Sequence, residues 1–134
     1  MNSLNRFAKP VYCALRLIVG LMFACHGGQK LFGLFGGPAE LGDPEGLVAG
    51  IIELGAGILV AVGLFTRIAA LLASGEMAVA YFEAHAVRAF FPIQNHGELA
   101  VLFCWAFLFI FFYGSGRWSL DALIKRKSNH ITHA

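Results

Sequence analysis

The sequence predicts an all-α protein embedded in a membrane, built as a four-helix bundle of antiparallel spans. The first observation is composition: 58% of the 134 residues are hydrophobic and 13% are charged, against about 45–50% and about 25% in soluble domains. The second is that the apolar residues gather in four stretches, each near the ~20 residues that cross a bilayer as a helix. A chain of this length predicts a single membrane domain, residues 1–134.

The four spans are separated by clear breaks in the apolar pattern. We expect the spans over residues 11–31, 46–64, 68–85 and 97–113. The segment 35–45 is rich in Gly, Pro and acidic residues, which predicts a loop. Three further breaks are expected: a tight turn at Thr66–Arg67, a loop over residues 88–95, and the end of the fourth span at Gly114–Gly116.

The chain ends in a short basic tail, residues 117–134, whose last part from Lys125 onward is expected to be frayed or disordered. Arg6 and Lys9 precede the first span and Arg67 lies in the second connection. If four helices alternate, these cations and the tail share one side, which the positive-inside rule places in the cytoplasm. Both termini are therefore expected there, with Trp118 anchoring the interface. A net charge of +2 without a basic stripe excludes nucleic acid as a partner.

Three carboxylates lie within the apolar stretches: Glu53, Glu76 and Glu98. A charge in a bilayer costs about 2.5–3.5 kcal/mol on insertion scales, so each is expected to be paired or functional. Antiparallel alternation brings polar ends of all four spans to the outer leaflet. The residues that converge there are His26 and Lys30 on the first span, Glu53 on the second, His85 on the third, and Asn95, His96 and Glu98 at the fourth.

Helical phase assigns interior faces to the first three spans. Gly20 and Gly27 share a stripe with Arg16 and Lys30, and small residues on the second span form a similar face around Glu53. Such glycines let neighbouring backbones approach closely. Phenylalanines are expected to face mainly lipid. Glu76 lies on a small-residue stripe of the third span, and Arg16 either pairs with it or extends to the interface. Arg16 and Glu76 are therefore assigned to a structural polar network.

Several polar residues have a structural interpretation as well. Glu98 follows Asn95 by three positions, the spacing of a capping box at a helix N-terminus. His85 and His96 are interpreted as interfacial hydrogen-bonding groups more readily than as metal ligands, since no HExxH or HxxxH spacing occurs. No metal site is expected. The three scattered cysteines are interpreted as small packing residues.

The outer-leaflet residues allow a limited chemistry. A buried carboxylate can exchange protons near neutral pH, and Lys30 or a histidine beside it can hold a carbonyl or an oxyanion. This suits a quinone, a small phenol or an oxidised sulfur compound, and it suits a proton-coupled carrier equally well. No nucleophile–base pair, phosphate loop or cofactor fingerprint is present.

At these residues the chain resembles the DoxX family of small four-span membrane proteins. The matching stretches, in order, are Arg16, His26–Gly33, Ile52–Gly57, Gly63–Arg67, Glu76–Met77, Ala84–His85, Asn95–Glu98, Gly114–Gly116 and Ser119–Asp121. The resemblance covers nearly the whole chain and implies a multi-pass protein of the inner, or plasma, membrane. It also implies a link to quinol oxidase, to thiosulfate–quinone oxidoreductase or to redox detoxification.

The leading hypothesis is a membrane subunit of a quinone-linked oxidoreductase or redox-detoxification system, inactive without a soluble or peripheral oxidoreductase. Glu53 and Glu98 are the predicted proton-relaying catalytic residues. The predicted substrate-binding residues are His26, Lys30, His85, Asn95 and His96. A bound quinone is the only cofactor that the hypothesis names. Two rival hypotheses remain: a small-molecule or proton-coupled transporter, and an assembly protein whose polar network only fixes helix packing.

Overall fold

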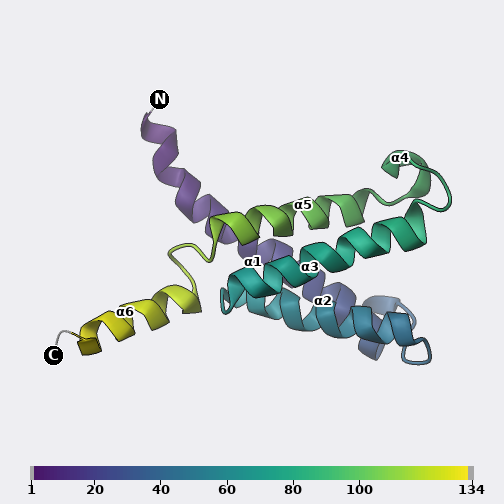
Figure 1. Ribbon diagram of the computed structural model, residues 1–134, viewed down its shortest axis with the longest axis horizontal. Helices are drawn as coiled ribbons and strands as arrows, with labels where there is room; N and C mark the ends of the chain where they lie inside the picture. Colours follow the sequence, from purple (N-terminus) through teal and green to yellow (C-terminus); the bar gives the residue numbers. More distant parts are fainter. Residues whose placement is uncertain (1, 133–134) are drawn as a thin grey trace.

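The computed structural model describes residues 2–132, with side chains described for residues 4–129. All regular structure in this range is helical, which confirms the all-α prediction for these residues (Figure 1). The elements are α1 (Asn2–Phe32), the 3₁₀ turn η1 (Leu34–Gly36), α2 (Pro44–Val62), α3 (Thr66–Ala80), the π-helical turn η2 (Tyr81–His85), α4 (Pro92–Asn95), α5 (Glu98–Tyr113) and α6 (Leu120–Thr132).

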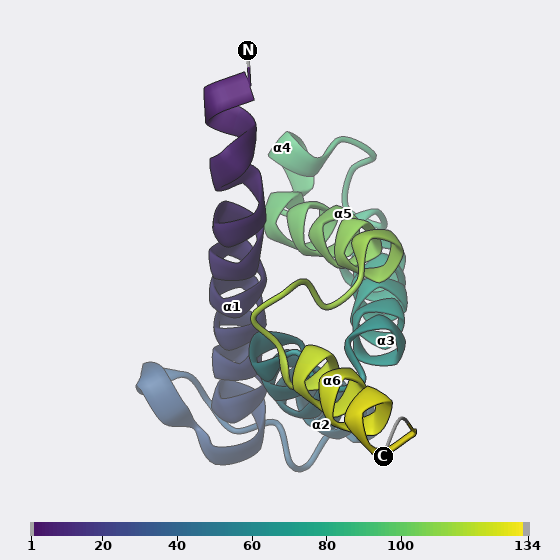
Figure 2. The ribbon, with the colours of Figure 1, turned by 90° about the vertical axis from the view of Figure 1, so that its left-hand side faces the viewer.

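Four long helices make up the body of the molecule. α1 packs against α2, α2 against α3, and α3 against α5. The axes of α2, α3 and α5 are roughly aligned, and the chain runs along α3 opposite to α2 and α5 (Figure 1). α1 crosses these three helices obliquely (Figures 1 and 2). Within the described residues, α1 and α2 are long and apolar enough to span a membrane. α3 and α5 are shorter, at 15 and 16 residues, although η2 extends α3 without a break. A regular bundle of four antiparallel spans stays a prediction.

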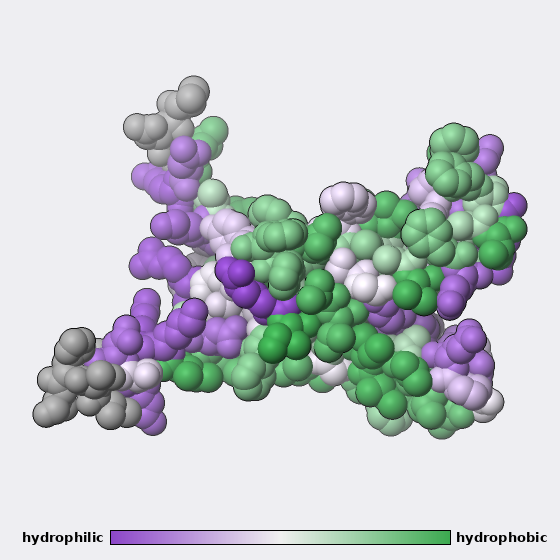
Figure 3. Space-filling model, in the orientation of Figure 1, coloured by the Kyte–Doolittle hydropathy of each residue, from purple (hydrophilic) through white to green (hydrophobic). Residues whose placement is uncertain are grey.

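The surface shows the polarity expected of a chain in a bilayer. Hydrophobic residues cover the middle of the molecule, and hydrophilic residues gather at both ends (Figure 3). Large apolar side chains such as Leu102 and Trp105 on α5 are about two-thirds exposed. Large apolar side chains at this exposure are unfavourable in water, whereas in a bilayer they contact lipid tails that are equally apolar.

Glycines hold α1 and α2 together, as the helical phase predicts. A Cβ added at Gly20 would lie 2.7 Å from the carbonyl oxygen of Gly57, and one at Gly27 would lie 2.7 Å from that of Gly50. Neither helix can carry a side chain at these crossings, because backbone already fills the space.

The apolar core contains residues of all four long helices, α1, α2, α3 and α5. Phe23 of α1 is fully buried and contacts Phe103 and Phe107 of α5, with ring centroids 5.4 and 4.7 Å away. Most of the other phenylalanines are exposed, as expected of lipid-facing positions. The expectation therefore holds for the majority and is wrong for these three, which supply the bulk that small residues on α3 leave unfilled.

The turn between α2 and α3 differs from the prediction. It comprises residues 63–65, and Thr66 and Arg67 are the first residues of α3. Gly63 ends α2 in the left-handed region with φ of 74°, a conformation that glycine adopts without strain. Asp121 of α6 then accepts hydrogen bonds from the Phe65 and Thr66 amides and the Thr66 hydroxyl, at 2.9, 3.1 and 2.8 Å.

The expectation of a frayed tail is wrong for the described residues. α6 continues to Thr132, and residues 133–134 lie outside the part of the chain that the structure describes. The helix forms because its first turn is fixed to the rest of the molecule. Besides the Asp121 contacts, the Asp121 amide donates to the Gly63 carbonyl at 2.9 Å, and the Ser119 hydroxyl accepts from the Ala122 amide at 3.1 Å as an N-cap.

Candidate functional site

A groove of about 840 Å³ lies between α2 and α3, near the loop that joins α1 to α2. Its walls are apolar side chains and small residues of both helices. The apolar lining comprises Val48, Ala49, Ile52, Leu71, Leu72, Val79 and Ala80. Small-molecule sites typically measure about 300–1,000 Å³ and place a few polar groups among apolar ones, so this groove has the size and lining of a ligand site.

An ion pair joins α1 to α2 at the groove. The Lys30 ammonium donates to Oε1 of Glu53 at 2.8 Å. Glu53 is only 2% exposed, while the Lys30 side chain is 26% exposed and lines the groove. The structure thus brings together the two residues that the outer-leaflet argument paired, and Lys30 reaches the groove while Glu53 lies behind it.

A second carboxylate faces the same groove from α3. Glu76 lines the groove and lies within electrostatic range of both Glu53 and Lys30. Two buried carboxylate oxygens, Oε2 of Glu53 and Oε2 of Glu76, have no hydrogen-bond partner among the described residues. Buried polar atoms are nearly always paired in native proteins. These two oxygens can therefore accept hydrogen bonds that the described residues do not supply.

His26 lies one turn before Lys30 on α1 and is half-buried. It is within electrostatic range of Glu53, and its ring contacts Phe103 edge-on, with centroids 5.9 Å apart. His26 thus borders the Lys30–Glu53 pair without lining the groove.

The rim of the groove is acidic. Glu40, Asp43 and Glu45 line it from the loop and the first turn of α2, and Glu83 lines it from η2. The sequence analysis placed the first three in a loop, on the acidic composition of segment 35–45. Only the folded structure shows that these charges surround one opening.

His85 and Asn95 meet in a separate cluster at the loop before α5. The Asn95 carbonyl lies 3.1 Å from Nδ1 of His85. The Asn95 amide nitrogen donates to the Ala89 carbonyl at 2.7 Å and to the Tyr81 hydroxyl at 3.3 Å. Asn95 is 1% exposed, and its side chain is occupied in fixing this loop. None of these residues lines the groove.

The prediction of a capping box at the start of α5 is wrong. The Asn95 side-chain oxygen accepts from the Gly97 amide at 2.7 Å, and the N-cap of α5 is Gly97, without a side-chain cap. His96 adopts φ of 58° between them, so the chain turns before α5 begins and Asn95 cannot reach the amide of Glu98. Glu98 and His96 are exposed, and no ion pair joins Glu98 to the groove residues among the described side chains.

Arg16 does not pair with Glu76. It is 2% exposed, and its guanidinium donates to the Val60 carbonyl, to the Ala61 carbonyl at 3.0 Å and to the Trp118 carbonyl at 2.6 Å. The end of α2 leaves carbonyls without helical partners, and Arg16 satisfies them. Glu76 is therefore separate from any Arg16 network, and its place in the groove is what sequence reasoning missed.

The described residues contain no group of three or more His, Cys, Asp or Glu side chains placed to hold a metal ion. The site is therefore best described by its acids, one lysine and apolar walls.

Comparison with known protein families gives a match. The DoxX family profile matches residues 11–86, more than half of the chain. The chain belongs to the DoxX family. The matched region of this DoxX protein runs from α1 through η2 and contains Lys30, Glu53 and Glu76, whereas Asn95, His96 and Glu98 lie beyond it.

Two relatives extend the similarity over most of the chain. An uncharacterized protein of Haemophilus influenzae is 44% identical over 128 residues, covering 90% of this chain and 96% of its own length. An uncharacterized membrane protein of Mycobacterium tuberculosis is 29% identical over 147 residues, covering 93% of this chain and 88% of its own length. No solved structure matches significantly. The DoxX chain described here is accordingly a membrane protein.

Proposed function

We propose that this DoxX-family protein is the membrane subunit of a quinone-linked oxidoreductase system and that the groove between α2 and α3 binds the quinone ring. The observation that carries the proposal is the set of Lys30, Glu53 and Glu76 beside the apolar walls of the groove, with one oxygen of each carboxylate buried and without a partner among the described residues. A quinone presents an apolar ring and carbonyl oxygens that accept hydrogen bonds. The groove offers apolar walls and one ammonium that can donate to such an oxygen.

Each residue has a defined role in this proposal. Lys30 keeps one N–H on Glu53 and directs another to a quinone carbonyl. Reduction of a quinone to a quinol takes up two electrons and two protons. The Glu76 carboxyl supplies one proton to a ring oxygen and the Lys30 ammonium supplies the other. Water at the mouth of the groove reprotonates both groups, and the Glu53 carboxylate holds Lys30 in place. The electrons come from a soluble or peripheral oxidoreductase bound to the membrane subunit, since the sequence carries no cofactor fingerprint.

The proposed placement in the membrane rests on the distribution of basic residues. The protein crosses the plasma membrane with both termini in the cytoplasm, and the groove opens at the opposite face. The basic residues near the N-terminus and in α6 favour this orientation. Figure 1 draws the N-terminus and α6 at the end of the molecule away from the α1–α2 loop, which agrees with it.

The test is quinone binding by the purified full-length protein in lipid nanodiscs, with a short-tailed ubiquinone analogue as probe and equilibrium filtration as the measurement. Lys30→Gln and Glu76→Gln are expected to weaken binding about tenfold each, the effect of losing one charge-assisted hydrogen bond of about 1.5 kcal/mol. Glu98→Gln is the matched control, because it removes an exposed carboxylate outside the groove. It also tests the predicted catalytic role of Glu98.

The result decides between the hypotheses. Unchanged quinone affinity in both groove variants would overturn the proposal, and a loss in Glu98→Gln alone would move the site to the start of α5. Lower stability without any change in binding would favour the assembly protein.

A carrier for a small organic cation is the second candidate, and a specific observation favours it. Five carboxylates line the groove against one lysine: Glu40, Asp43, Glu45, Glu76 and Glu83. This excess of negative charge attracts a cation. Liposomes with an imposed pH gradient separate the two candidates. A carrier is expected to take up a fluorescent quaternary ammonium compound, and Glu76→Gln is expected to abolish that uptake. Quinone binding without uptake supports the redox subunit.

A further inference from the structure

A second groove, of about 530 Å³, lies at the other end of the molecule, where the chain passes from α5 into α6. Its lining combines apolar, basic and amphipathic side chains: Val62, Leu120 and Leu123; Arg117 and Arg126; Trp118 and Ser119. Neither the quinone proposal nor the resemblance uses any of these seven positions as a site.

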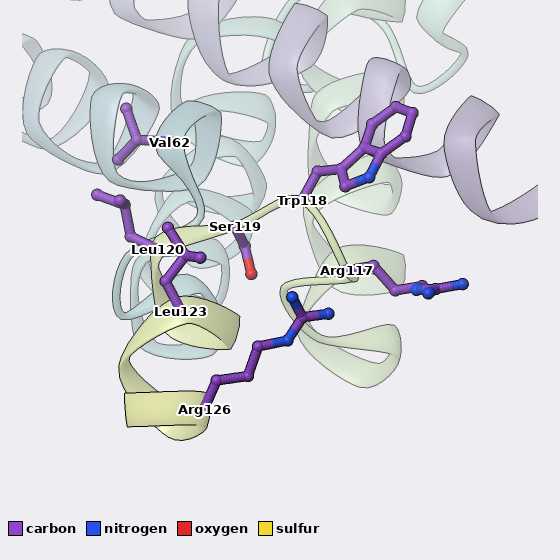
Figure 4. Close-up of a pocket in the computed structure, with 7 residues that line it drawn as sticks. All are labelled: Val62, Arg117, Trp118, Ser119, Leu120, Leu123 and Arg126. Atoms are coloured by element: carbon purple, nitrogen blue, oxygen red, sulfur yellow. The ribbon is translucent and has the colours of Figure 1, made fainter. Parts of the chain in front are cut away.

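The apolar and the basic side chains of this groove occupy different parts of it (Figure 4). Val62, Leu120 and Leu123 form one wall, and the Arg126 guanidinium points back along the groove toward the turn that carries Ser119 (Figure 4). Arg117 extends to the other side of the turn (Figure 4). Neither arginine is in an ion pair, since the salt bridge found among the described residues joins Lys30 to Glu53.

The groove is held in place by hydrogen bonds between segments far apart in the sequence and within the turn before α6. Asp121 fixes the start of α6 to the α2–α3 turn, and Arg16 holds the Trp118 carbonyl at 2.6 Å. The Ser119 hydroxyl donates to the Gly116 carbonyl at 2.9 Å. Arg126 is therefore presented on an anchored helix.

The composition of α6 matches a helix that lies in a membrane interface. Leu123 and Ile124 are 58% and 57% exposed, and Lys125, Arg126 and Lys127 follow directly. Trp118 is 69% exposed beside them, and tryptophan is enriched at the headgroup level of membranes. Exposed apolar residues next to lysine and arginine on one short helix are typical of helices that lie in a membrane interface.

We propose that this groove binds one anionic phospholipid, with its phosphate on Arg126 and an acyl chain against Val62, Leu120 and Leu123. Arginine presents planar, paired donors that fit a phosphate, and the apolar wall continues from the cations toward the hydrophobic middle of the molecule. The occupant is a phospholipid because it carries an anion and an apolar chain together, and because the groove lies beside the exposed Trp118 of a membrane protein. The site lies apart from the quinone groove and does not depend on its function.

The experiment uses the full-length protein with Trp105→Phe, which leaves Trp118 as the single tryptophan of the two. The protein is placed in phosphatidylcholine nanodiscs with a minor fraction of phosphatidylglycerol, and either lipid carries brominated acyl chains that quench tryptophan on contact. At equal bromine content, brominated phosphatidylglycerol is expected to quench Trp118 with about fivefold higher apparent affinity, the effect of one arginine near an anionic headgroup.

Arg126→Gln is the test variant and Lys127→Gln its matched control. Both remove one positive charge from α6, but only Arg126 lines the groove. We expect Arg126→Gln to abolish the preference for phosphatidylglycerol and Lys127→Gln to keep it. Equal losses would show diffuse attraction to the bilayer and would overturn the site.

Two further outcomes also overturn the proposal. Equal quenching by the two lipids in the Trp105→Phe protein would leave the basic groove to an acidic protein partner. Loss of quenching with inorganic phosphate, relative to potassium chloride of the same ionic strength, would assign the groove to a free anion. A melting curve of each variant in the same nanodiscs establishes that α6 and the body remain folded.

Discussion

Arg16 and Glu53 are equally buried, each 2% exposed, yet the protein treats them differently. Arg16 donates to three backbone carbonyls, has no carboxylate partner among the described residues, and leaves its Nε unpaired at a place that borders neither groove. Glu53 has one oxygen on Lys30 and the other without a partner. Lys30 and Arg16 are fourteen residues apart on α1, which is about 21 Å along the helix, so the two sites lie near opposite ends of the same helix pair.

The comparison shows that burial of a charge does not by itself indicate function. Arg16 completes the hydrogen bonding at the end of α2 and fixes the chain that enters α6, so its role is structural. Glu53 and Glu76 leave hydrogen-bonding capacity unused beside a groove. Unused capacity next to an opening is the property that separates a ligand site from a structural one.

The largest expected effect is at Arg16. Arg16→Gln removes the guanidinium donors of the Ala61 and Trp118 carbonyls, whereas the Val60 carbonyl keeps the Gly63 amide as a donor. Each unsatisfied group costs about 1–3 kcal/mol, so we expect about 3 kcal/mol lower stability. Arg16→Lys keeps the charge but not the planar donors and should lose part of this. Denaturant unfolding in detergent micelles measures both. Wild-type stability in Arg16→Gln, or lost quinone binding at unchanged stability, would contradict the structural role.

Removing the cation of the other site should cost slightly less. Lys30→Met leaves Glu53 buried without a partner, and breaking a buried pair from one side costs about 3–5 kcal/mol; the partial exposure of Lys30 places the effect at the low end. Adding Glu53→Gln removes the uncompensated charge and should restore most of the stability. The same unfolding assay completes the double-mutant cycle, and additive losses would show that the pair contributes nothing.

The glycine contacts between α1 and α2 hold both sites in place, and substitutions at two glycines of α2 test these contacts. A Cβ at Gly57 would meet the Ala24 amide nitrogen at 2.5 Å, whereas one at Gly55 meets nothing within 4 Å. Gly57→Ala is expected to cost about 1–3 kcal/mol through overpacking. Gly55→Ala should be neutral or slightly stabilising because alanine favours helix. Thermal unfolding of the two variants compares them directly, and equal melting temperatures would place the close contact elsewhere.

The smallest effect concerns the attachment of α6. Partial burial raises the pKa of the Asp121 carboxyl, but hydrogen bonds from the Thr66 amide and hydroxyl and from the Phe65 amide outweigh it, so the pKa lies below its usual value. A carboxyl with a depressed pKa stabilises the folded state above its unfolded pKa of about 3.9, and this is lost as pH falls through the folded value. Because these hydrogen bonds are exposed or only partly buried, we expect them to contribute about 1 kcal/mol together.

Trp118 fluorescence in the Trp105→Phe protein reports this attachment. We expect α6 to loosen as pH falls below about 4. Asp121→Asn should be looser at neutral pH and should lack the acidic transition. An acidic transition that persists unchanged in Asp121→Asn would show that another group holds α6.

Sequence reasoning located the helices well because apolar length and glycine breaks are local. α5 begins and ends within one residue of the predicted fourth span, and η2 completes α3 at His85, where the third span was expected to end. The predictions were wrong for the turn at residues 63–65 and for the helix at 120–132, and both errors have the same cause. The turn and the helix are each stabilised by Asp121 contacts between positions more than fifty residues apart, and no local pattern reports such a partner.

The site divides in the same way. The sequence by itself determined an all-helical membrane chain with acids among its apolar stretches, and it indicated that Lys30 and Glu53 approach each other, since helix alternation and glycine faces fix which ends meet. Only the tertiary structure decided that Glu76 faces the groove, that Asn95 secures a loop and that Arg16 binds carbonyls. Helical period fixes the face a residue occupies, whereas the crossing angle and rotation of each helix fix its neighbours, and these depend on packing across the whole chain.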